Sequence, residues 1–528
     1  METIKRTRGR NVRPALGTAA AGLLALAFGL LPSSAAAAPQ PVPAPAIPGA
    51  PSLPGPLAAP SQPAENMGLL KATPDIAAAG SKFTLSGSKL PAGKNVSIVW
   101  MTSNVNWILD ARPDSVDYIG QQETKGVGVV LGTTTTDARG GFSLGLTVPR
   151  DFGGIHDVYA VIDGVQQAKG GFLIERTLKI TPLKGPVGTM MTIKLAGLGS
   201  TLYGGSASVW YDGRYSGVVT GKWTRGEATV HIRAAGPVGE HTVLIGTGMQ
   251  FNYLNIKQSP IPWATGGMKT FVVTKDAGPP PARTDWPVTV RPTVDTRTTL
   301  SSANLGVSGA GAAVRLDSAS GVVNAKVAVT ATGLTPGQPV TFDWATVVGN
   351  RVNCTGSCWQ FVSIPLGGGT AAADGSVRST FTVPDGLGGW HVVRVMQGGQ
   401  VKAQISYFVK RSVISAPRTV KAGRPFQVHL KGVGWTQLDN TVAVTYDNGY
   451  IGYGCGFNSN GDVVLDLVAT GGPGTHLIDI YPLLYPYQPA YAYPPHAAVP
   501  FLSFARDFPG LALGYQLPAF RLAIKVVA

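Results

Sequence analysis

Four histidines occupy equivalent places in a repeated local pattern, and imidazole is the side chain best suited to acid–base work or metal binding near neutral pH. Each stands two residues after a glycine and directly before a β-prone run; they are His156, His241, His391 and His476. A metal or catalytic centre needs several such groups within a few ångström of one another. One histidine per repeat does not supply that, so we predict a structural role for all four. The ring face would pack on a core and one N–H would meet a backbone carbonyl.

The spacing of these histidines indicates a duplication. His156 and His391 are 235 residues apart, and so are His241 and His476. Pro149 and Pro384 repeat the same offset. A fixed offset is the mark of repeated units. The chain therefore reads as a two-unit block, A–B, that occurs twice.

Other motifs that could carry chemistry are weak. Gly141–Gly145 ("GFSLG") formally matches a nucleophile elbow, which requires a strand, a sharp turn and a helix, but the alternation continues through Ser143 and predicts a strand. The sequence has no HExxH pair, phosphate loop or dinucleotide fingerprint. We predict no enzyme activity, no catalytic residue, no metal site and no cofactor.

Composition bounds the fold class. The 528 residues are 44% hydrophobic and only 13% charged, with 69 glycines and 41 prolines. Long amphipathic helical patterns are missing, whereas short β-type runs with Gly/Pro joints recur. The sequence predicts an all-β protein of four tandem immunoglobulin-like sandwich modules in the order A–B–A–B, each burying its own core.

The N-terminus has the features of an export signal. A basic stretch precedes an apolar one and a run of small residues suited to cleavage near Ala36–Ala38. No later segment has the roughly 20 apolar residues of a membrane span. We expect a secreted, extracellular protein that is not inserted in a membrane. Association with the cell wall is compatible with this expectation.

Charge suggests the kind of partner. The formal net charge is +15, and loss of residues 1–38 removes five basic residues and one acid, leaving +11. Outside a cell the accessible polyanions are wall polymers and acidic polysaccharides. The basic residues are scattered, which argues against specific nucleic-acid binding. The predicted partner is an extracellular polymer, a wall polysaccharide or other polyanion, or a surface protein.

Pattern and composition give the following division of the chain. Residues 1–38 are the signal peptide, 39–66 a proline-rich linker, 67–176 module A1, 177–276 module B1, 277–312 a second linker, 313–411 module A2, and 412–528 module B2. The first linker has ten prolines in residues 39–64, a density that favours stiff polyproline II. Cys354 and Cys358 are predicted to form a small disulfide loop, rather than a zinc site, since two further ligands are missing.

Both A modules place a tryptophan, Trp100 or Trp344, on an early central strand. A longer irregular segment follows, over Thr102–Thr136 and Thr346–Ala373. Each B module has a "Y-D-x-x-Y" hairpin turn, at Tyr211–Tyr215 and Tyr446–Tyr450.

The opening of B1 carries a family resemblance. Leu178–Gly199 ("LKITPLKGPVGTMMTIKLAGLG") resembles the start of bacterial immunoglobulin-like modules of the IPT/TIG kind, with an "I-x-P" strand and a "G-P-x-G-T" turn; Leu70–Leu90 is a looser version. The resemblance covers about four-fifths of the mature chain as pattern. It implies non-catalytic stalk, adhesive or carbohydrate-associated modules of secreted proteins, although a fold does not fix a function.

Long insertions before the last strand of each B module are the best candidates for ligand binding, because flat rings on loops give contact area at low entropy cost. The candidate residues are Phe251, Tyr253, Trp263, Tyr481, Tyr485, Tyr487, Tyr491 and Tyr493. The alternative is that these rings, with Phe501, fold back and cover a sheet edge or a neighbouring module.

Three functions remain open at this point. The first is a secreted, non-enzymatic surface or matrix protein with a structural or adhesive role, which binds through aromatic loops and positive charge. The second is a carbohydrate-binding accessory protein. The third is a secreted hydrolase with its site in one of the two irregular segments.

Overall fold

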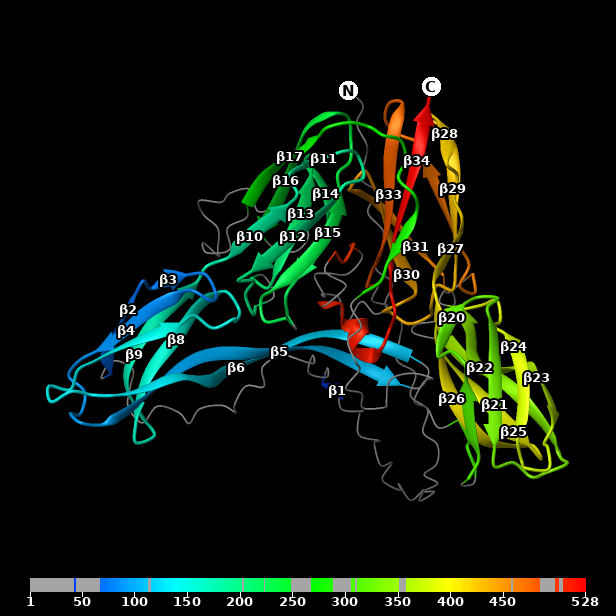
Figure 1. Ribbon diagram of the computed structural model, residues 1–528, viewed down its shortest axis with the longest axis horizontal. Helices are drawn as coiled ribbons and strands as arrows, with labels where there is room; N and C mark the ends of the chain where they lie inside the picture. Colours follow the sequence, from blue (N-terminus) through cyan, green and yellow to red (C-terminus); the bar gives the residue numbers. More distant parts are fainter. Residues whose placement is uncertain are drawn as a thin grey trace, which may run out of the picture. The chain divides into compact units, whose positions relative to one another are not determined.

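A computed structural model describes residues 42–43, 67–112, 115–201, 204–222, 224–247, 267–287, 305–308, 311–350, 358–456, 459–484, 499–502 and 507–528. Within these ranges the regular structure is all β, apart from one short 3-10 helix, η4 (Pro509–Leu513). The all-β prediction is therefore confirmed for the described chain (Figure 1).

Residues of A1, together with β1 from the predicted linker 39–66, form one nine-stranded assembly in the order β1-β5-β8-β9-β2-β4-β7, with β3 on β9 and β6 on β5. Its strands are β1 (Val42–Pro43), β2 (Gly68–Thr73), β3 (Ile76–Ala77), β4 (Lys82–Gly87), β5 (Asn95–Arg112), β6 (Ser115–Thr135), β7 (Phe142–Thr147), β8 (Gly154–Ile162) and β9 (Val165–Ile174). Ser143 lies within β7, so "GFSLG" is a strand and not a nucleophile elbow.

A2 consists of a three-stranded sheet, β19-β21-β24, and a five-stranded one, β20-β26-β25-β22-β23. Its strands are β19 (Ala313–Leu316), β20 (Ser320–Val322), β21 (Lys326–Thr332), β22 (Pro339–Asn350), β23 (Cys358–Thr370), β24 (Val377–Thr382), β25 (Gly389–Gln397) and β26 (Gln400–Lys410).

B1 repeats the three-plus-five pattern with the sheets β10-β12-β15 and β11-β17-β16-β13-β14. Its strands are β10 (Thr177–Thr181), β11 (Lys184–Gly185), β12 (Met190–Ala196), β13 (Ser206–Tyr211), β14 (Arg214–Thr220), β15 (Ala228–Arg233), β16 (Gly239–Thr247) and β17 (Gly267–Val273). A small sheet facing a larger one across a shared core is the arrangement of immunoglobulin-like sandwiches.

B2 has the sheets β27-β29-β32 and β18-β34-β33-β30-β31, with β28 also on β34. Its strands are β27 (Ser412–Ser415), β28 (Thr419–Lys421), β29 (Pro425–Lys431), β30 (Thr441–Tyr446), β31 (Gly449–Cys455), β32 (Val463–Val468), β33 (Gly474–Pro482) and β34 (Ala519–Val527). The extra strand, β18 (Arg283–Asp285), belongs to the predicted linker 277–312 and pairs antiparallel with β34.

The two segments expected to be irregular are instead long β-hairpins. Residues 102–135 lie almost entirely in β5 and β6, which pair from Asn95 with Thr135 to Arg112 with Ser115. In A2, β22 and β23 pair from Pro339 with Thr370 to Asn350 with Cys358. Inter-strand hydrogen bonds pair the backbone N–H and C=O groups along these hairpins. A polar, glycine-containing sequence can therefore form a two-stranded ribbon even though it lacks the alternation of apolar and polar residues that predicts a strand.

The prediction that each module buries its own core is wrong for B1. One hydrophobic cluster joins the inward residues of β12, β13, β15 and β16 to side chains from B2 and from Phe408 of A2. The B2 members are Leu438, Leu477, Tyr481, Leu484, Val499, Phe501, Leu502, Phe508, Leu511, Leu513, Tyr515, Leu517 and Ala519. Period-2 alternation fixes which face of a strand is apolar but not which neighbour covers it.

The insertion of B2 covers an edge strand of B1. Val218 of β14 donates its N–H to the carbonyl of Pro500 at 2.9 Å, and Leu502 donates back to the Val218 carbonyl at 2.9 Å. Gly217 allows this approach, because a Cβ there would lie 2.6 Å from the Pro500 oxygen. The open edge that β14 would otherwise present to solvent is thereby paired.

Candidate functional site

The four histidines share one hydrogen bond. In each, Nε2 donates to the carbonyl of the residue four positions earlier, at 2.7–2.9 Å. Because a carbonyl only accepts, Nε2 must carry a proton. Each ring also lies against an aromatic ring of its own module, with centroid separations of 4.4–5.6 Å. The aromatic partners are Trp100 and Trp344 in the A modules and Tyr211 and Tyr446 in the B modules.

In the B modules the second ring nitrogen contacts a carboxylate. His241 Nδ1 lies 2.6 Å from Asp212, and His476 Nδ1 lies 2.6 Å from Asp447. Both aspartates have positive φ, 49° and 47°, at the predicted hairpin turns. The A modules differ, since His156 Nδ1 contacts the carbonyl of Met101 at 2.8 Å. Each histidine thus connects the beginning of its strand to a turn or strand of its own module.

Two of the histidines have pKa values shifted in opposite directions. Burial lowers the pKa of His391 to about 4. The hydrogen bond with Asp447 raises the pKa of His476 above its usual value, because both partners of that ring only accept hydrogen bonds and favour the imidazolium. Protonation therefore opposes folding at His391 and supports it at His476.

We expect opposite pH dependences from His391→Gln and His476→Gln. The stabilisation from neutral His391 is present above the unfolded pKa of about 6.5 and is lost as pH falls toward 4, by about 3 kcal/mol in full. The deficit of His391→Gln should therefore shrink on acidification. The deficit of His476→Gln should be largest at acid pH and shrink as pH rises through the raised pKa. Urea unfolding of both variants and the native chain between pH 4.5 and 8 measures this, and deficits that do not change with pH would contradict it.

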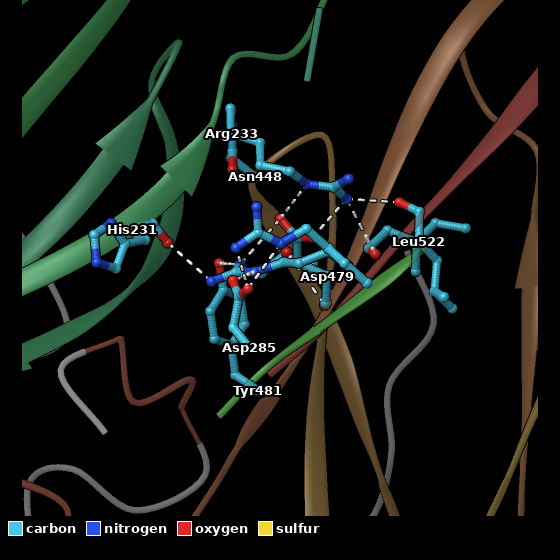
Figure 2. Close-up of polar contacts among 11 residues, drawn as sticks. His231, Arg233, Asp285, Asn448, Asp479, Tyr481 and Leu522 are labelled. Atoms are coloured by element: carbon cyan, nitrogen blue, oxygen red, sulfur yellow. Dashed lines mark hydrogen bonds and ion pairs between the residues drawn. The ribbon is translucent and has the colours of Figure 1, made fainter. Parts of the chain in front are cut away.

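A buried polar network joins B1 to B2 (Figure 2). Arg233, at the end of β15, donates to Asp479 of β33 at 2.5 Å and to the Leu522 carbonyl at 2.6 Å. Arg521 of β34 donates to Tyr481 at 2.5 Å and to Asp285 of β18 at 2.9 Å. Arg521 also lies 3.4 Å from Asp479. Two guanidinium groups, two carboxylates and a phenol thus meet, with every charge opposed by another.

Backbone groups complete this network. Arg521 donates to the His231 carbonyl at 3.1 Å, and Asn448 donates to the Arg233 carbonyl at 2.6 Å. The charged side chains are 1–3% exposed, apart from Asp285 at 18%. Paired, buried charges therefore hold the two B modules in one relative position. Such buried ion pairs can make a contact geometrically specific even where their net contribution to stability is small.

The electrostatics of the network favour fixed charges over proton transfer. Burial opposes the charge on Arg521, but Tyr481, Asp479 and Asp285 outweigh it and raise its pKa above the usual range. Burial raises the pKa of Tyr481 to about 12. Burial also acts to raise the pKa of Asp285, but hydrogen bonds from Arg521 and Arg283 lower it overall. None of these groups has a pKa moved toward neutrality, as an acid or base catalyst requires.

Lys222 is a buried amine that the sequence did not single out. Its Nζ donates to the carbonyls of Ser200 and Thr201 at 2.9 and 2.5 Å, and its side chain is 1% exposed. Burial lowers its pKa to about 8. These carbonyls orient the amine, and burial separates it from solvent. Lys222 is therefore suited to hold the loop before β13 in place rather than to act as a nucleophile.

A basic groove of about 960 Å³ lies where the linker carrying β18 passes along B2. Trp286, 47% exposed, and the side chains of Arg283, Arg418 and Lys525 line it, and its described lining residues include no carboxylate. Lys410 Nζ lies 5.2 Å from the centre of the Trp286 ring. A flat ring beside several cations suits a polyanionic or sugar-containing chain.

Residues 277–312 were predicted to be a linker, and this groove was not predicted from the sequence. The available signal was Arg283-Thr-Asp-Trp286, an aromatic residue and a cation within a proline-rich stretch. Prolines 279–281 line the same groove. A spacer of such composition can be fixed when one of its segments joins a sheet, as β18 does here.

The predicted aromatic ligand residues divide into two groups. Tyr481 is 1% exposed and belongs to the buried network, and Phe501 is fully buried against Phe508 at 5.1 Å. The remaining candidates lie outside the described residues; they are Phe251, Tyr253, Trp263, Tyr485, Tyr487, Tyr491 and Tyr493. Tyr481 and Phe501 therefore pack against the neighbouring module, which was the alternative to ligand binding.

Cys354 and the side chain of Cys358 lie outside the described residues, and Cys455 of β31 lies 3.4 Å from Thr441 Oγ1. Over the described ranges there is no group of three or more metal-ligating side chains. No helix in the same ranges has the length and hydropathy needed to span a membrane.

Comparison with known proteins finds no matching family model and no matching curated protein. Several solved structures match at low identity. Native alpha-2-macroglobulin of E. coli is 9% identical over 86% of this chain, which spans only 30% of its length, with a TM-score of 0.16. The ICAM-5 D1–D4 ectodomain fragment is 11% identical over 87% of this chain and 100% of its own, with a TM-score of 0.18.

A putative membrane anchored protein from Corynebacterium diphtheriae is 12% identical over 66% of this chain and 92% of its own, with a TM-score of 0.17. Likeness at these TM-scores assigns no function. The immunoglobulin-like character of the sheets is therefore argued from their own strand order, and the IPT/TIG resemblance stays a prediction.

Proposed function

We propose that this chain is a secreted, non-enzymatic protein of four immunoglobulin-like modules in the order A–B–A–B, with a structural or adhesive role at a cell surface or in an extracellular matrix. The observation that carries the proposal is the basic groove beside Trp286. It combines the exposed ring of Trp286 and the cation of Arg283, on a linker that β18 fixes to the sheet of B2, with the cations Arg418 and Lys525 of B2 itself.

The surroundings of the groove support binding rather than turnover. The groove lies next to the buried network, because Arg521 and Asp285 join β34 to the linker strand. A fixed backbone under a charged, aromatic surface presents contacts without a large ordering cost on binding. An extracellular polyanion such as an acidic wall polysaccharide is the partner whose chemistry fits this surface and the net charge of +11 that remains without residues 1–38.

Binding of immobilised hyaluronan and of purified wall teichoic acid by residues 39–528 tests the proposal. We expect binding that weakens as salt is added, because exposed charges are screened. Trp286→Ala combined with Arg418→Ala should reduce affinity about tenfold or more, since an aromatic residue and a cation are the usual dominant contacts.

The matched control makes the same change in net charge at a site outside the groove. Lys71→Ala removes one positive charge, as Arg418→Ala does, at an exposed cation of A1 far along the sequence from the groove residues. This control should leave most of the affinity intact. The proposal fails if neither polymer is bound, and the assignment to the groove fails if the control loses as much affinity as the groove variant.

A further inference from the structure

The outer face of the small B1 sheet, β10-β12-β15, carries cations and no acidic residue. Lys179 of β10, Lys194 of β12 and His231 of β15 alternate with buried residues of their strands, and all three are exposed. None of these strands contains Asp or Glu. Glu227, which directly precedes β15, lies 3.9 Å from Arg150. The face is therefore a positive surface that its own strands do not neutralise.

Lys179 and Lys194 lie directly opposite each other on this face. Lys179 pairs with Lys194 across the β10–β12 ladder, and Lys194 pairs with Thr229 across the β12–β15 ladder. Residues opposite each other in antiparallel strands have Cβ atoms about 5 Å apart, and like charges in that position are destabilising. Folding alone gives no reason for two exposed lysines in this arrangement. An anionic ligand gives one, because a single negative group can lie against both ammonium groups.

The adjacent row of the same face carries hydroxyl groups. Thr181 pairs with Thr192, and Thr192 pairs with His231. Thr192 Oγ1 lies 3.2 Å from His231 Nδ1. Alternate residues of a strand are about 7 Å apart, so the hydroxyl row runs beside the lysine pair. Since a hydroxyl both donates and accepts hydrogen bonds, cations next to hydroxyls suit a ligand with acidic groups and sugar hydroxyls.

The second B module does not repeat this surface. At the positions 235 residues after Lys179, Lys194 and His231, it has Ile414, His429 and Asp466. His429 Nε2 contacts Asp462 of its own module. The face of B2 thus has carboxylates that the face of B1 lacks. The charge is therefore a difference between the repeats and not a general property of the module.

This face continues toward the groove beside Trp286. The His231 carbonyl accepts a hydrogen bond from Arg521 at 3.1 Å, and Arg521 donates to Asp285 of β18 at 2.9 Å (Figure 2). Trp286 follows Asp285 directly in the chain. Burial lowers the pKa of His231, and the charges of Arg521, Asp285 and Arg283 also act on it. His231 therefore lies between the lysine pair and the linker segment that lines the groove.

We infer that the outer face of β10-β12-β15, with Lys179 and Lys194 at its centre, is a second contact site for an acidic polysaccharide bound in the groove beside Trp286. The carboxylates of the polymer lie against the two ammonium groups, and its hydroxyls lie against the threonine row. The flat Trp286 ring favours a backbone of sugar rings over one of glycerol phosphate. This inference rests on the proposed function and adds a consequence to it. A chain held at both places binds more tightly than one held at a single place, because the second contact forms within the complex.

Amine labelling of residues 39–528 tests the contact directly. The chain is acetylated with and without saturating long-chain hyaluronan, which carries a carboxylate on alternate sugars, and each lysine is followed by mass spectrometry. We expect slower acetylation of Lys179 and Lys194 in the complex. Lys71 of A1 and Lys326 of A2, both exposed, should react at unchanged rates. Equal labelling of Lys179 and Lys194 with and without bound polymer overturns the inference, and protection by wall teichoic acid alone overturns the assignment to a polysaccharide.

Paired variants separate this site from the groove. Lys179→Ala with Lys194→Ala should weaken binding of long hyaluronan about tenfold and leave binding of a hyaluronan tetrasaccharide unchanged, because the short chain occupies the groove only. Trp286→Ala with Arg418→Ala should weaken binding of both. Lys71→Ala with Lys326→Ala removes the same charge as the lysine-pair variant and should keep the affinity for long chains. Thermal unfolding checks that each variant is folded.

The outcomes distinguish this inference from the proposed function. If the lysine-pair variant binds long chains as tightly as its control, the second site is wrong and binding in the groove stands. An equal loss for short and long chains in the lysine-pair variant also overturns the second site, because it would mean that the lysines act on the groove by general attraction. A native chain that binds neither chain length overturns the proposed function and this inference with it.

Discussion

Replacing Asp479 with alanine should lower the free energy of unfolding by about 3–5 kcal/mol, because removal of one partner leaves buried charge uncompensated. Asp479 is 1% exposed and faces Arg233 at 2.5 Å and Arg521 at 3.4 Å. Asp285 still opposes Arg521 in the variant, so Arg233 is the group left without a carboxylate. Urea unfolding followed by tryptophan fluorescence measures the change.

An exposed ion pair provides the matched control for this prediction. Asp163 pairs with Lys94 at 3.1 Å, with side chains 73% and 50% exposed. Lys94→Ala should cost no more than about 1 kcal/mol, and added salt should reduce even that. A combined Arg233→Met, Asp479→Leu variant should recover part of the loss, since a buried pair can be replaced by apolar side chains. Equal losses in Asp479→Ala and Lys94→Ala would contradict the role of the network.

Phe501→Ala should destabilise the chain by about 3–5 kcal/mol, the range for a large core aromatic residue. Phe501 belongs to B2 in sequence, but it is fully buried in the cluster that fills B1 and packs edge-on against Phe508. Because the same segment pairs with β14, the loss should fall on B1 as well as on B2. Calorimetry should show one joint transition for the B modules in the native chain, and hydrogen exchange should show faster exchange in β14 of the variant.

Phe361→Ala is the control for core truncation. Phe361 lies on β23 and is 47% exposed, so its removal should change stability by about 0.5 kcal/mol. If Phe501→Ala left exchange in β14 unchanged, the B2 insertion would not be what protects that edge.

Local sequence was sufficient to predict many of the shorter strands and the two B hairpin turns. Alternating residues in β4 and β8 are buried in turn, as a half-buried strand requires. The aspartates at the two B hairpins take the positive φ that such turns need. The apolar run with two interspersed cations near the C-terminus forms β34 (Ala519–Val527). These features depend on near neighbours in the chain, and the duplication made each of them visible twice.

Contacts between the modules could not be predicted from one sequence, because they join residues far apart in the chain. Arg233 and Asp479 are 246 residues apart. At the equivalent positions, 235 residues away, the other repeat has Val468 and Leu244. In the sequence, the pair therefore appears as two isolated charged residues where the other repeat has apolar ones. Leu244 faces Met268 across strands of B1 where Asp479 faces Arg521 in B2. A change of charge between repeats was the available signal, but it does not reveal the partner.

The sequence by itself determined a duplicated, all-β chain with its strand faces and hairpin turns, since alternation and turn chemistry are local. Only the tertiary structure decided that B1 shares its core with B2, that a linker segment becomes β18, and that Pro500–Leu502 covers the edge of β14. The physical reason is that apolar surface and backbone edges can be satisfied by any neighbour of suitable shape. Which neighbour does so depends on how the chain brings distant segments together.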